Sequence, residues 1–507
     1  MKKIMIKTKA FAILMVLAIS LICINSVSAA SFSLGTTHGT VDTNSLIITE
    51  NKNLTVSNVP AGDTLAAYKI IDVFYNQASN AITYEFTSDF KNFLASSTEY
   101  RNLTIENYAN MTSGDITSGS ITSTSTLDRL ASSYATYIKG HNINGTTLNT
   151  NGNTRTTSLP LGSYIVLPTS TSKIYAVMVG NLALSEENGE WTANNQTIVA
   201  KVSEPGIVTK TINGDKETDS VYIGTEFTYT ITGSIPRYPT NATNKKYMIT
   251  DTMSNGLTFS GLTSVNVTDG TTRLTVNTNG TVTDSSNQVV ANITINGQVI
   301  TIDFNLDNVK STEITVTYKA KLNNNAIIGG EGNKNDAKLT YANDPYSTST
   351  HDSEPDTTKV YTYGLEILKY SGTDKTAVLE GAVFDIYSNA SLTNKVGTIT
   401  TDEDGYAEYL GIPAGTYYLK ETKAPNGHTL LADAISIEVA GNNSMLSPTN
   451  SGYYYAEISN NKNLFLPFTG GMGTYAYTII GLLIIVIAVV IYIIYRKRSS
   501  NKDNNEE

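Results

Sequence analysis

The sequence predicts an all-β protein made of three tandem β-sandwich domains, the first with an added helix. Threonine-rich stretches at 226–232 and 313–318 alternate polar and apolar residues, and this period of two is typical of half-buried strands. Only 16% of the 507 residues are charged, and Thr, Asn, Ser, Gly, Tyr and Val dominate, as in extracellular β proteins. The length allows about three domains of ordinary size once a leader and a tail are set aside.

Changes in composition divide the chain into segments. A boundary falls at Glu204-Pro205-Gly206, and the polar residues 347–358 are typical of a linker. The predicted segments are a signal peptide 1–29, an N-terminal domain 31–203, a second domain 204–346, a linker 347–359, a third domain 360–463 and a C-terminal segment 466–507 with a membrane helix 475–495.

The N-terminus has the pattern of a secretory leader. Lysines at positions 2, 3, 7 and 9 precede an apolar run at 11–24, and the small residues at 27–29 predict cleavage after Ala29 or Ala30. Cys23, the one cysteine, lies in this leader, so the mature chain cannot form disulfides. A secreted chain of this kind must be stabilised by large cores, bound metal or another crosslink.

The first domain contains one predicted helix. Leu127, Leu130, Ala131, Tyr134 and Ile138 fall on one helical face, and the helix is expected to end at Gly140.

The C-terminus combines a short motif, an apolar span and a basic tail. Leu466, Pro467, Phe468, Thr469 and Gly470 precede the apolar residues 475–495, which are followed by Arg-Lys-Arg. This order resembles the cell-wall sorting signal of Gram-positive surface proteins. The resemblance implies that sortase cuts between Thr469 and Gly470 and transfers the Thr469 carboxyl to an amine. The alternative is an ordinary tail-anchored membrane protein.

Three polar residues of the third domain are directed into the core by strand alternation. Lys369 shares a strand face with Leu365 and Ile367, Glu421 shares one with Tyr417 and Leu419, and Asn460 shares one with Ile458. Burying an unpaired ion costs about several kcal/mol, so an amine, an acid and an amide together in a small core predict a reaction. Desolvation disfavours the charged forms, and a neutral amine can then attack the carboxamide with help from the acid. The product is an intramolecular isopeptide bond; the alternative is an exposed ion pair on an edge strand.

The third domain resembles a collagen-adhesin B-type domain of a Gram-positive pilin. Residues 417–427 read YYLKETKAPNG and are similar to the pilin E-box, YxLxETxAPxGY. His428 replaces the final aromatic residue of that motif, which leaves the acid Glu421 in place. The resemblance implies immunoglobulin-like, collagen-adhesin-type sandwiches.

The second domain shows a variant of the same arrangement. Lys210 shares a strand face with Val208 and Ile212, and Asp251 shares one with Tyr247 and Ile249. Asn343 shares a third face with Leu339 and Tyr341. The stretches 249–259 and 333–345 resemble the fimbrial isopeptide-forming domain, which uses Asp in place of Glu. The resemblance implies Lys210 as the amine, Asp251 as the catalytic acid and Asn343 as the acceptor. Asn335 has the same parity and is the second choice; a satisfied polar cluster without a bond is the alternative.

The first domain lacks the complete set. Residues 162–168 match the E-box spacing, but Pro168 stands where the acid belongs, so Lys69 has no evident acid partner and no bond is expected. Pilin polymerisation requires an acceptor lysine in a motif similar to WxxxVxVYPK. Trp191 precedes Lys201 at a spacing one residue longer, without the proline, and Lys201 is the predicted acceptor; an ordinary exposed lysine is the alternative.

The predicted function is that of a structural pilus subunit rather than an enzyme. Its expected partners are sortase, identical and accessory pilin subunits, peptidoglycan and host surface ligands, and its expected location is the Gram-positive cell wall. The net charge of −10 argues against nucleic-acid binding. His38, His141, His351 and His428 are scattered, so no metal or cofactor is expected. A monomeric, wall-anchored adhesin that binds host matrix is the alternative function.

Overall fold

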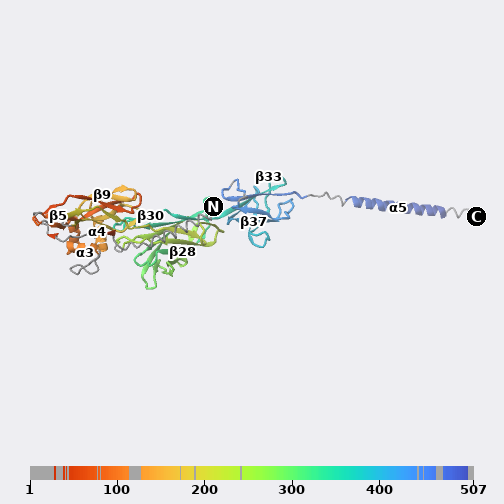
Figure 1. The fold of residues 1–507 in the computed structure, drawn as a ribbon. Coiled ribbons are helices and arrows are strands. Elements are labelled where there is room, and N and C mark those ends of the chain that lie inside the picture. Colours follow the sequence, from red (N-terminus) through yellow and green to blue (C-terminus); the bar gives the residue numbers. More distant parts are fainter. Residues whose placement is uncertain are drawn as a thin grey trace, which may run out of the picture. The chain divides into compact units, whose positions relative to one another are not determined.

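The computed structural model describes residues 45–500 together with 28–29, 38–39 and 42, apart from 77, 80, 114–126, 172, 188–189, 240–241, 442–444, 449 and 464–471. Figure 1 shows the helices and strands along the chain. The chain divides into two compact units, 1–362 with 411–413, and 363–410 with 414–507. The first unit contains two separate hydrophobic cores, one formed mainly by residues 54–200 and the other mainly by residues 208–360. The predicted fold class, tandem β domains with few helices, is confirmed.

The first core is enclosed by two sheets. An eight-stranded sheet has the order β1-β12-β10-β5-β6-β2, with β3 and β7 also paired to β5, and a four-stranded sheet has the order β15-β4-β9-β8. Two small antiparallel pairs, β11 with β16 and β13 with β14, complete the strands. The strands are β1 Ser28–Ala29, β2 His38–Gly39, β3 Ser45–Ile47, β4 Asn51–Ser57, β5 Thr64–Asn76, β6 Ala81–Phe86, β7 Thr146–Thr147, β8 Asn149–Asn151, β9 Thr154–Pro160, β10 Gly162–Ser170, β11 Ile174–Tyr175, β12 Met178–Leu182, β13 Leu184–Glu187, β14 Glu190–Ala193, β15 Gln196–Val199 and β16 Val202–Ser203.

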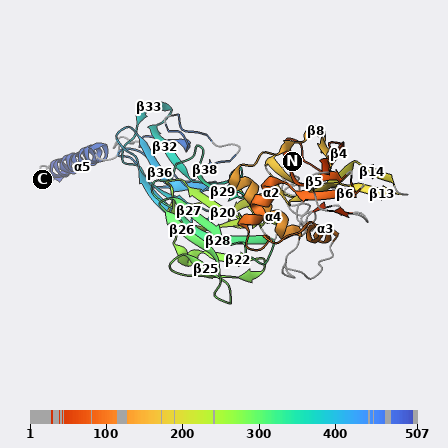
Figure 2. The same ribbon diagram turned by 90° about the vertical axis from the view of Figure 1, so that its left-hand side faces the viewer.

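Three helices, rather than the single predicted one, pack in the first domain. They are α2 Ser88–Ser96, α3 Ile105–Ser113 and α4 Leu127–His141, and they lie together in Figure 2. The predicted helix is confirmed as α4, which buries Leu130, Ala131, Tyr134 and Ile138. The edge of the Phe90 ring on α2 meets Tyr134, with centroids 4.7 Å apart. The sequence analysis missed α2 and α3 because each has only nine residues and several polar ones.

The second core lies between two further sheets. A six-stranded sheet has the order β17-β19-β28-β22-β23 with β21 beside β28, and a nine-stranded sheet has the order β18-β31-β29-β20-β27-β26-β25-β24 with β30 beside β29. The elements are β17 Val208–Ile212, β18 Thr218–Ser220, β19 Glu226–Ser234, β20 Tyr247–Met253, β21 Leu257–Phe259, the 3-10 helix η1 Leu262–Ser264, β22 Asn266–Asp269, β23 Thr272–Arg273, β24 Thr275–Val276, β25 Thr281–Thr283, β26 Val289–Asn296, β27 Val299–Phe304, β28 Glu313–Leu322, β29 Asn333–Tyr341, β30 His351–Asp352 and β31 Asp356–Tyr361.

The predicted linker at 347–359 is wrong, because part of it belongs to the second sheet. β31 pairs with β29 on one side and with β18 on the other. Thr358 and Val360 point inward and are fully buried, so an alternating strand lies within a stretch whose polar composition resembles a linker. Composition alone cannot exclude a strand that alternates polar and buried residues.

The third domain forms two four-stranded sheets. One has the order β33-β32-β36, with β39 on β32, and the other has the order β35-β34-β37-β38. The first and last strands of the domain, β32 and β39, form a parallel pair. The strands are β32 Tyr363–Ser371, β33 Asp374–Val378, β34 Val383–Tyr387, β35 Lys395–Thr400, β36 Tyr406–Ile412, β37 Gly415–Lys423, β38 Ile435–Val439 and β39 Tyr453–Asn460.

A single long apolar helix, α5 Met472–Ser500, ends the described chain. Residues Tyr475–Arg498 have a mean hydropathy of 3.0 and are long and apolar enough to cross a membrane. The leader up to residue 27 and the motif at 466–470 lie outside the described residues.

Candidate functional site

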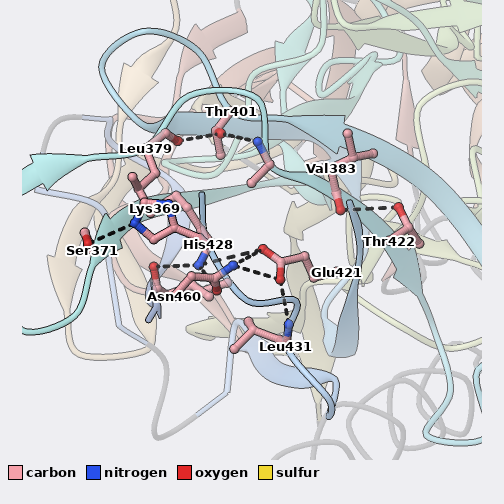
Figure 3. A network of polar contacts seen from close by, with 12 residues as sticks. Lys369, Ser371, Leu379, Val383, Thr401, Glu421, Thr422, His428, Leu431 and Asn460 are labelled. Carbon is pink, nitrogen blue, oxygen red and sulfur yellow. Dashed lines mark hydrogen bonds and ion pairs between the residues drawn. The ribbon is translucent and has the colours of Figure 1, made fainter. Parts of the chain in front are cut away.

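Lys369, Glu421 and Asn460 meet in the interior of the third domain, as strand alternation predicts. Lys369 lies on β32, Asn460 on the neighbouring β39 and Glu421 on β37 of the other sheet. All three side chains are buried. Figure 3 shows the three side chains converging.

The amine and the amide are in direct contact. Nζ of Lys369 donates to Oδ1 of Asn460 and, at 3.3 Å, to the backbone oxygen of Ile458. Nδ2 of Asn460 lies 2.8 and 3.0 Å from the two carboxylate oxygens of Glu421. The carboxamide is therefore held with its oxygen toward the amine and its nitrogen toward the acid.

The acid is fixed by its own partners. Oε1 of Glu421 lies 3.8 Å from Nζ of Lys369, and Oε2 accepts a 2.7 Å hydrogen bond from the backbone N–H of Leu431. The loop that supplies this N–H also contains His428, whose Nε2 lies 3.0 Å from Oγ of Ser371 at the end of β32 (Figure 3). The residue that departs from the E-box pattern thus ties this loop to the first strand.

Burial makes Lys369 a better nucleophile. Desolvation lowers the pKa of Lys369 to about 8, and the nearby Glu421 charge opposes this shift. A much larger fraction of this amine is therefore neutral near physiological pH than of an exposed lysine, and the neutral form carries the lone pair that attack requires.

The second domain holds a comparable cluster. Lys210 on β17 forms an ion pair with Asp251 on β20, and both side chains are buried. Tyr318 on β28 donates a hydrogen bond to the other carboxylate oxygen of Asp251 and lies 3.0 Å from Nζ of Lys210. Asn335 on β29 places its Nδ2 2.6 Å from the same hydroxyl.

Aromatic rings surround the second-domain amine. Nζ of Lys210 lies 4.7 Å from the centre of the Tyr229 ring and 5.3 Å from that of Tyr318. Burial lowers the pKa of Lys210, while the charge of Asp251 opposes the change. Burial therefore shifts the pKa of this amine in the same direction as that of Lys369.

The structure places the first-choice acceptor of the second domain, Asn343, outside the cluster. Strand β29 ends at Tyr341, so the alternation that placed Asn343 inward no longer applies to it. Its Nδ2 donates to the backbone oxygen of Thr171, and its Oδ1 accepts from Ser349. The second choice, Asn335, is the amide that lies beside Tyr318 in the cluster.

Lys69 of the first domain does have an acidic partner, contrary to the prediction. Its Nζ lies 2.8 Å from Asp72, three residues along the same strand β5. Both side chains are partly exposed, at 20% and 27%, so this pair resembles a surface ion pair more than the buried clusters. The expectation that no bond forms there stays a prediction.

Lys201 lies between β15 and β16 and is partly exposed, and its backbone oxygen accepts a 3.1 Å hydrogen bond from Ala176. Trp191 lies on β14. The acceptor role of Lys201 stays a prediction.

Several members of the two clusters could not be recognised from the sequence. Tyr318 and Tyr229 alternate inward on their strands like ordinary core residues, and the Leu431 N–H belongs to a loop. The inward parity of Tyr318 was visible in the 313–318 stretch, but no pattern indicated that its hydroxyl meets Asp251. Among the residues that the structure describes, no group of three or more His, Cys, Asp or Glu could hold a metal ion.

Two segments of the chain match known families of pilin domains. Residues 223–345 match the family described as Gram-positive pilin backbone subunit 2, Cna-B-like domain, and residues 364–451 match the SpaA prealbumin-like fold domain. The first range contains Asp251 and Asn335 but not Lys210, and the second contains Lys369 and Glu421 but not Asn460. These two segments therefore resemble pilin domains.

A surface protein and a fimbrial subunit have similar sequences. The trypsin-resistant surface T6 protein of Streptococcus pyogenes serotype M6 is 32% identical over 259 residues, which cover 48% of this chain and 47% of that protein. The fimbrial subunit type 2 of Actinomyces naeslundii is 27% identical over 415 residues, which cover 69% and 73%. The chain thus spans about half the length of the T6 protein and is similar in sequence to this surface protein and to this fimbrial subunit.

Solved structures agree on the architecture. The T6 backbone pilin of serotype M6 S. pyogenes, described as a modular three-domain structure, superposes with a TM-score of 0.62 at 25% identity, over 77% of this chain and 80% of that chain. The full-length major pilin SpaD of Corynebacterium diphtheriae has a TM-score of 0.50 at 20% identity, over 82% and 98%, and supports the fold alone.

Proposed function

We propose that this chain is a structural subunit of a covalent surface fibre, stabilised inside its domains by Lys–Asn isopeptide bonds. The observation that carries the proposal is the burial of an amine, a carboxyl and a carboxamide in contact in the third domain, with a similar cluster in the second. Burying well-packed apolar residues in such cores would cost less free energy than burying these ionisable groups. A reaction among the groups therefore explains their presence. The homology to fimbrial subunits supports the same conclusion.

In the third domain the proposed bond joins Nζ of Lys369 to Cγ of Asn460. The neutral amine attacks the carbonyl carbon, and Glu421 transfers protons from Nζ to Nδ2, which it already contacts, so that ammonia leaves. Because β32 and β39 are the first and last strands, this bond closes a loop over most of the domain. In the second domain the corresponding bond joins Lys210 to Asn335, with Asp251 as the acid.

Polymerisation is proposed to join the C-terminal end of one subunit to a lysine at the end of the first domain of the next. Sortase is proposed to cut after Thr469 and to join that residue to Lys201 of the next subunit or, at the last step, to peptidoglycan. Helix α5 would hold the precursor in the membrane until cleavage, which would leave the product on the wall of a Gram-positive cell. Accessory pilin subunits and host surface ligands are further proposed partners.

Mass spectrometry tests the internal bonds. The secreted part of the chain is expected to lack the mass of two ammonias, and digestion should yield peptides that link Lys369 with Asn460 and Lys210 with Asn335. A full, unmodified mass would overturn the proposal of internal bonds.

A gel assay separates the fibre from the rival function, a monomeric adhesin. Cells that carry Lys201→Ala are expected to lose the high-mass ladder on a denaturing gel. Lys173→Ala is the matched control, because Lys173 flanks β11, the partner strand of β16, and pairs with Glu204 at the surface. A ladder that persists in Lys201→Ala would reject Lys201 as acceptor, and the absence of any ladder in wild-type cells would favour the adhesin.

A further inference from the structure

The hydroxyl of Tyr318 lies at the centre of the second-domain cluster. Its oxygen is 3.0 Å from Nζ of Lys210 and 2.6 Å from Nδ2 of Asn335, and its proton points to Oδ2 of Asp251. A phenol can donate one hydrogen bond and accept two, which is the pattern found here. This one side chain therefore contacts the amine, the amide and the acid.

The third-domain cluster needs no such intermediary. There the carboxylate of Glu421 reaches Nδ2 of Asn460 directly, at 2.8 and 3.0 Å. Asp251 is one methylene shorter, and among the residues described its side chain bonds to Lys210 and Tyr318. Tyr318 thus occupies the position between acid and amide that the longer Glu421 side chain spans by itself.

We propose that Tyr318 is a catalytic residue in the formation of the second-domain isopeptide bond. Its hydroxyl relays a proton from Asp251 to the leaving nitrogen of Asn335. This inference rests on the proposed function, because it assumes that the Lys210–Asn335 bond forms.

Bond formation in the second domain requires four proton transfers among Lys210, Asp251, Tyr318 and Asn335. Lys210 first gives one proton of its ammonium group to Asp251, and the neutral amine attacks Cγ of Asn335. Tyr318 donates its phenol proton to Nδ2 and regains a proton from Asp251, so that the C–N bond breaks and ammonia leaves. Asp251 then accepts the second proton from Nζ, which becomes the amide nitrogen of the new bond.

The raised pKa of Tyr318 and the packing of its ring are both consistent with this role. Burial and the charge of Asp251 raise the pKa of Tyr318 well above its usual value, so the phenol keeps its proton between transfers. Its ring packs on Tyr229 and against the edge of Phe259, with centroids 5.4 and 5.7 Å away, which fixes the direction of the hydroxyl. Oδ1 of Asn335 has no hydrogen-bond partner among the described residues.

The test follows formation of the Lys210–Asn335 peptide over time in full-length chain made by a short pulse of cell-free synthesis. Tyr318→Phe is expected to slow this bond by roughly 100-fold, the size of a general acid–base contribution, and to leave the Lys369–Asn460 bond unchanged. Tyr247→Phe is the matched control, because Tyr247 is buried in the same core and its hydroxyl has no hydrogen-bond partner among the described residues. Equal rates for the wild type and Tyr318→Phe, or equal slowing by both substitutions, would overturn the proposal.

A second variant separates proton relay from packing. In Asp251→Glu/Tyr318→Phe the added methylene should let the carboxyl reach Nδ2, as Glu421 does, and bond formation should recover relative to Tyr318→Phe. A double variant no faster than Tyr318→Phe would reject the role of Tyr318 as the bridge. A wild-type chain that forms the Lys369–Asn460 bond but no Lys210–Asn335 bond would reject the proposed second-domain bond itself, and the relay proposal with it.

Discussion

Lys369 and Asn460 are in contact although 91 positions separate them in the sequence. The contact exists because β32 and β39 form a parallel pair whose register sets Lys369 opposite Ile458 and Ser371 opposite Asn460. The side chain of Lys369 then reaches along the strand to the carboxamide. A bond at this place would connect the two ends of the domain.

Glu421→Gln is expected to abolish the third-domain bond and to restore the mass of one ammonia. It should also lower the free energy of unfolding of this domain by about 4 kcal/mol, because the 91-residue loop is no longer closed in the unfolded chain. Thermal unfolding of the secreted part measures the loss. Glu366→Gln is the control, since Glu366 is equally buried on β32 but bonds to Ser447 and Asn450. Unchanged mass in Glu421→Gln would contradict the assigned role of Glu421.

The rate of third-domain bond formation should rise with pH up to about 8 and then level off. Burial lowers the pKa of Lys369 from 10.5 to about 8, so the protonated, unreactive amine is replaced by the neutral amine as the pH approaches 8. Below pH 8 the rate should therefore rise roughly tenfold per pH unit. Newly synthesised chain transferred to buffers of different pH, followed by quantified digestion, gives the profile. A rate that climbs steadily to about pH 10.5 would indicate an ordinary, solvated lysine.

Asn335→Ala and Asn343→Ala should differ in their effect on the second domain. The first removes the amide beside Tyr318 and is expected to leave Lys210 uncrosslinked. The second removes hydrogen bonds to Thr171 and Ser349 and should keep the crosslink. Peptide mapping of both proteins decides between them, and loss of the bond only in Asn343→Ala would reverse the assignment.

Force applied to the chain ends should bypass most of the third domain. With Lys369 joined to Asn460, the intervening residues cannot extend, whereas Asn460→Ala should release roughly 300 Å of additional length at about 3.3 to 3.6 Å per residue. Single-molecule extension of the secreted part measures the difference. Thr422→Ala, at an exposed position on β37, is the control, and equal lengths for wild type and Asn460→Ala would reject the mechanical role.

Much of the candidate site follows from the sequence because alternation is a local property of a strand. The parity of Lys369, Glu421, Lys210 and Asp251 with their apolar neighbours predicted their burial, and the structure confirms it. The helix α4 and the apolar segment within α5 were also predictable, since both have local periodicity or composition.

Tertiary structure decided which residues complete the clusters. Strand alternation directs a side chain only while the strand continues. Because β29 ends at Tyr341, Asn343 lies outside the cluster, whereas Asn335 lies within it. Tyr318 looks like any core tyrosine in its own strand, and only the packing of two sheets brings its hydroxyl to Asp251. Sequence therefore determined which way side chains point, whereas the distances between strands far apart in the chain determined which of them meet.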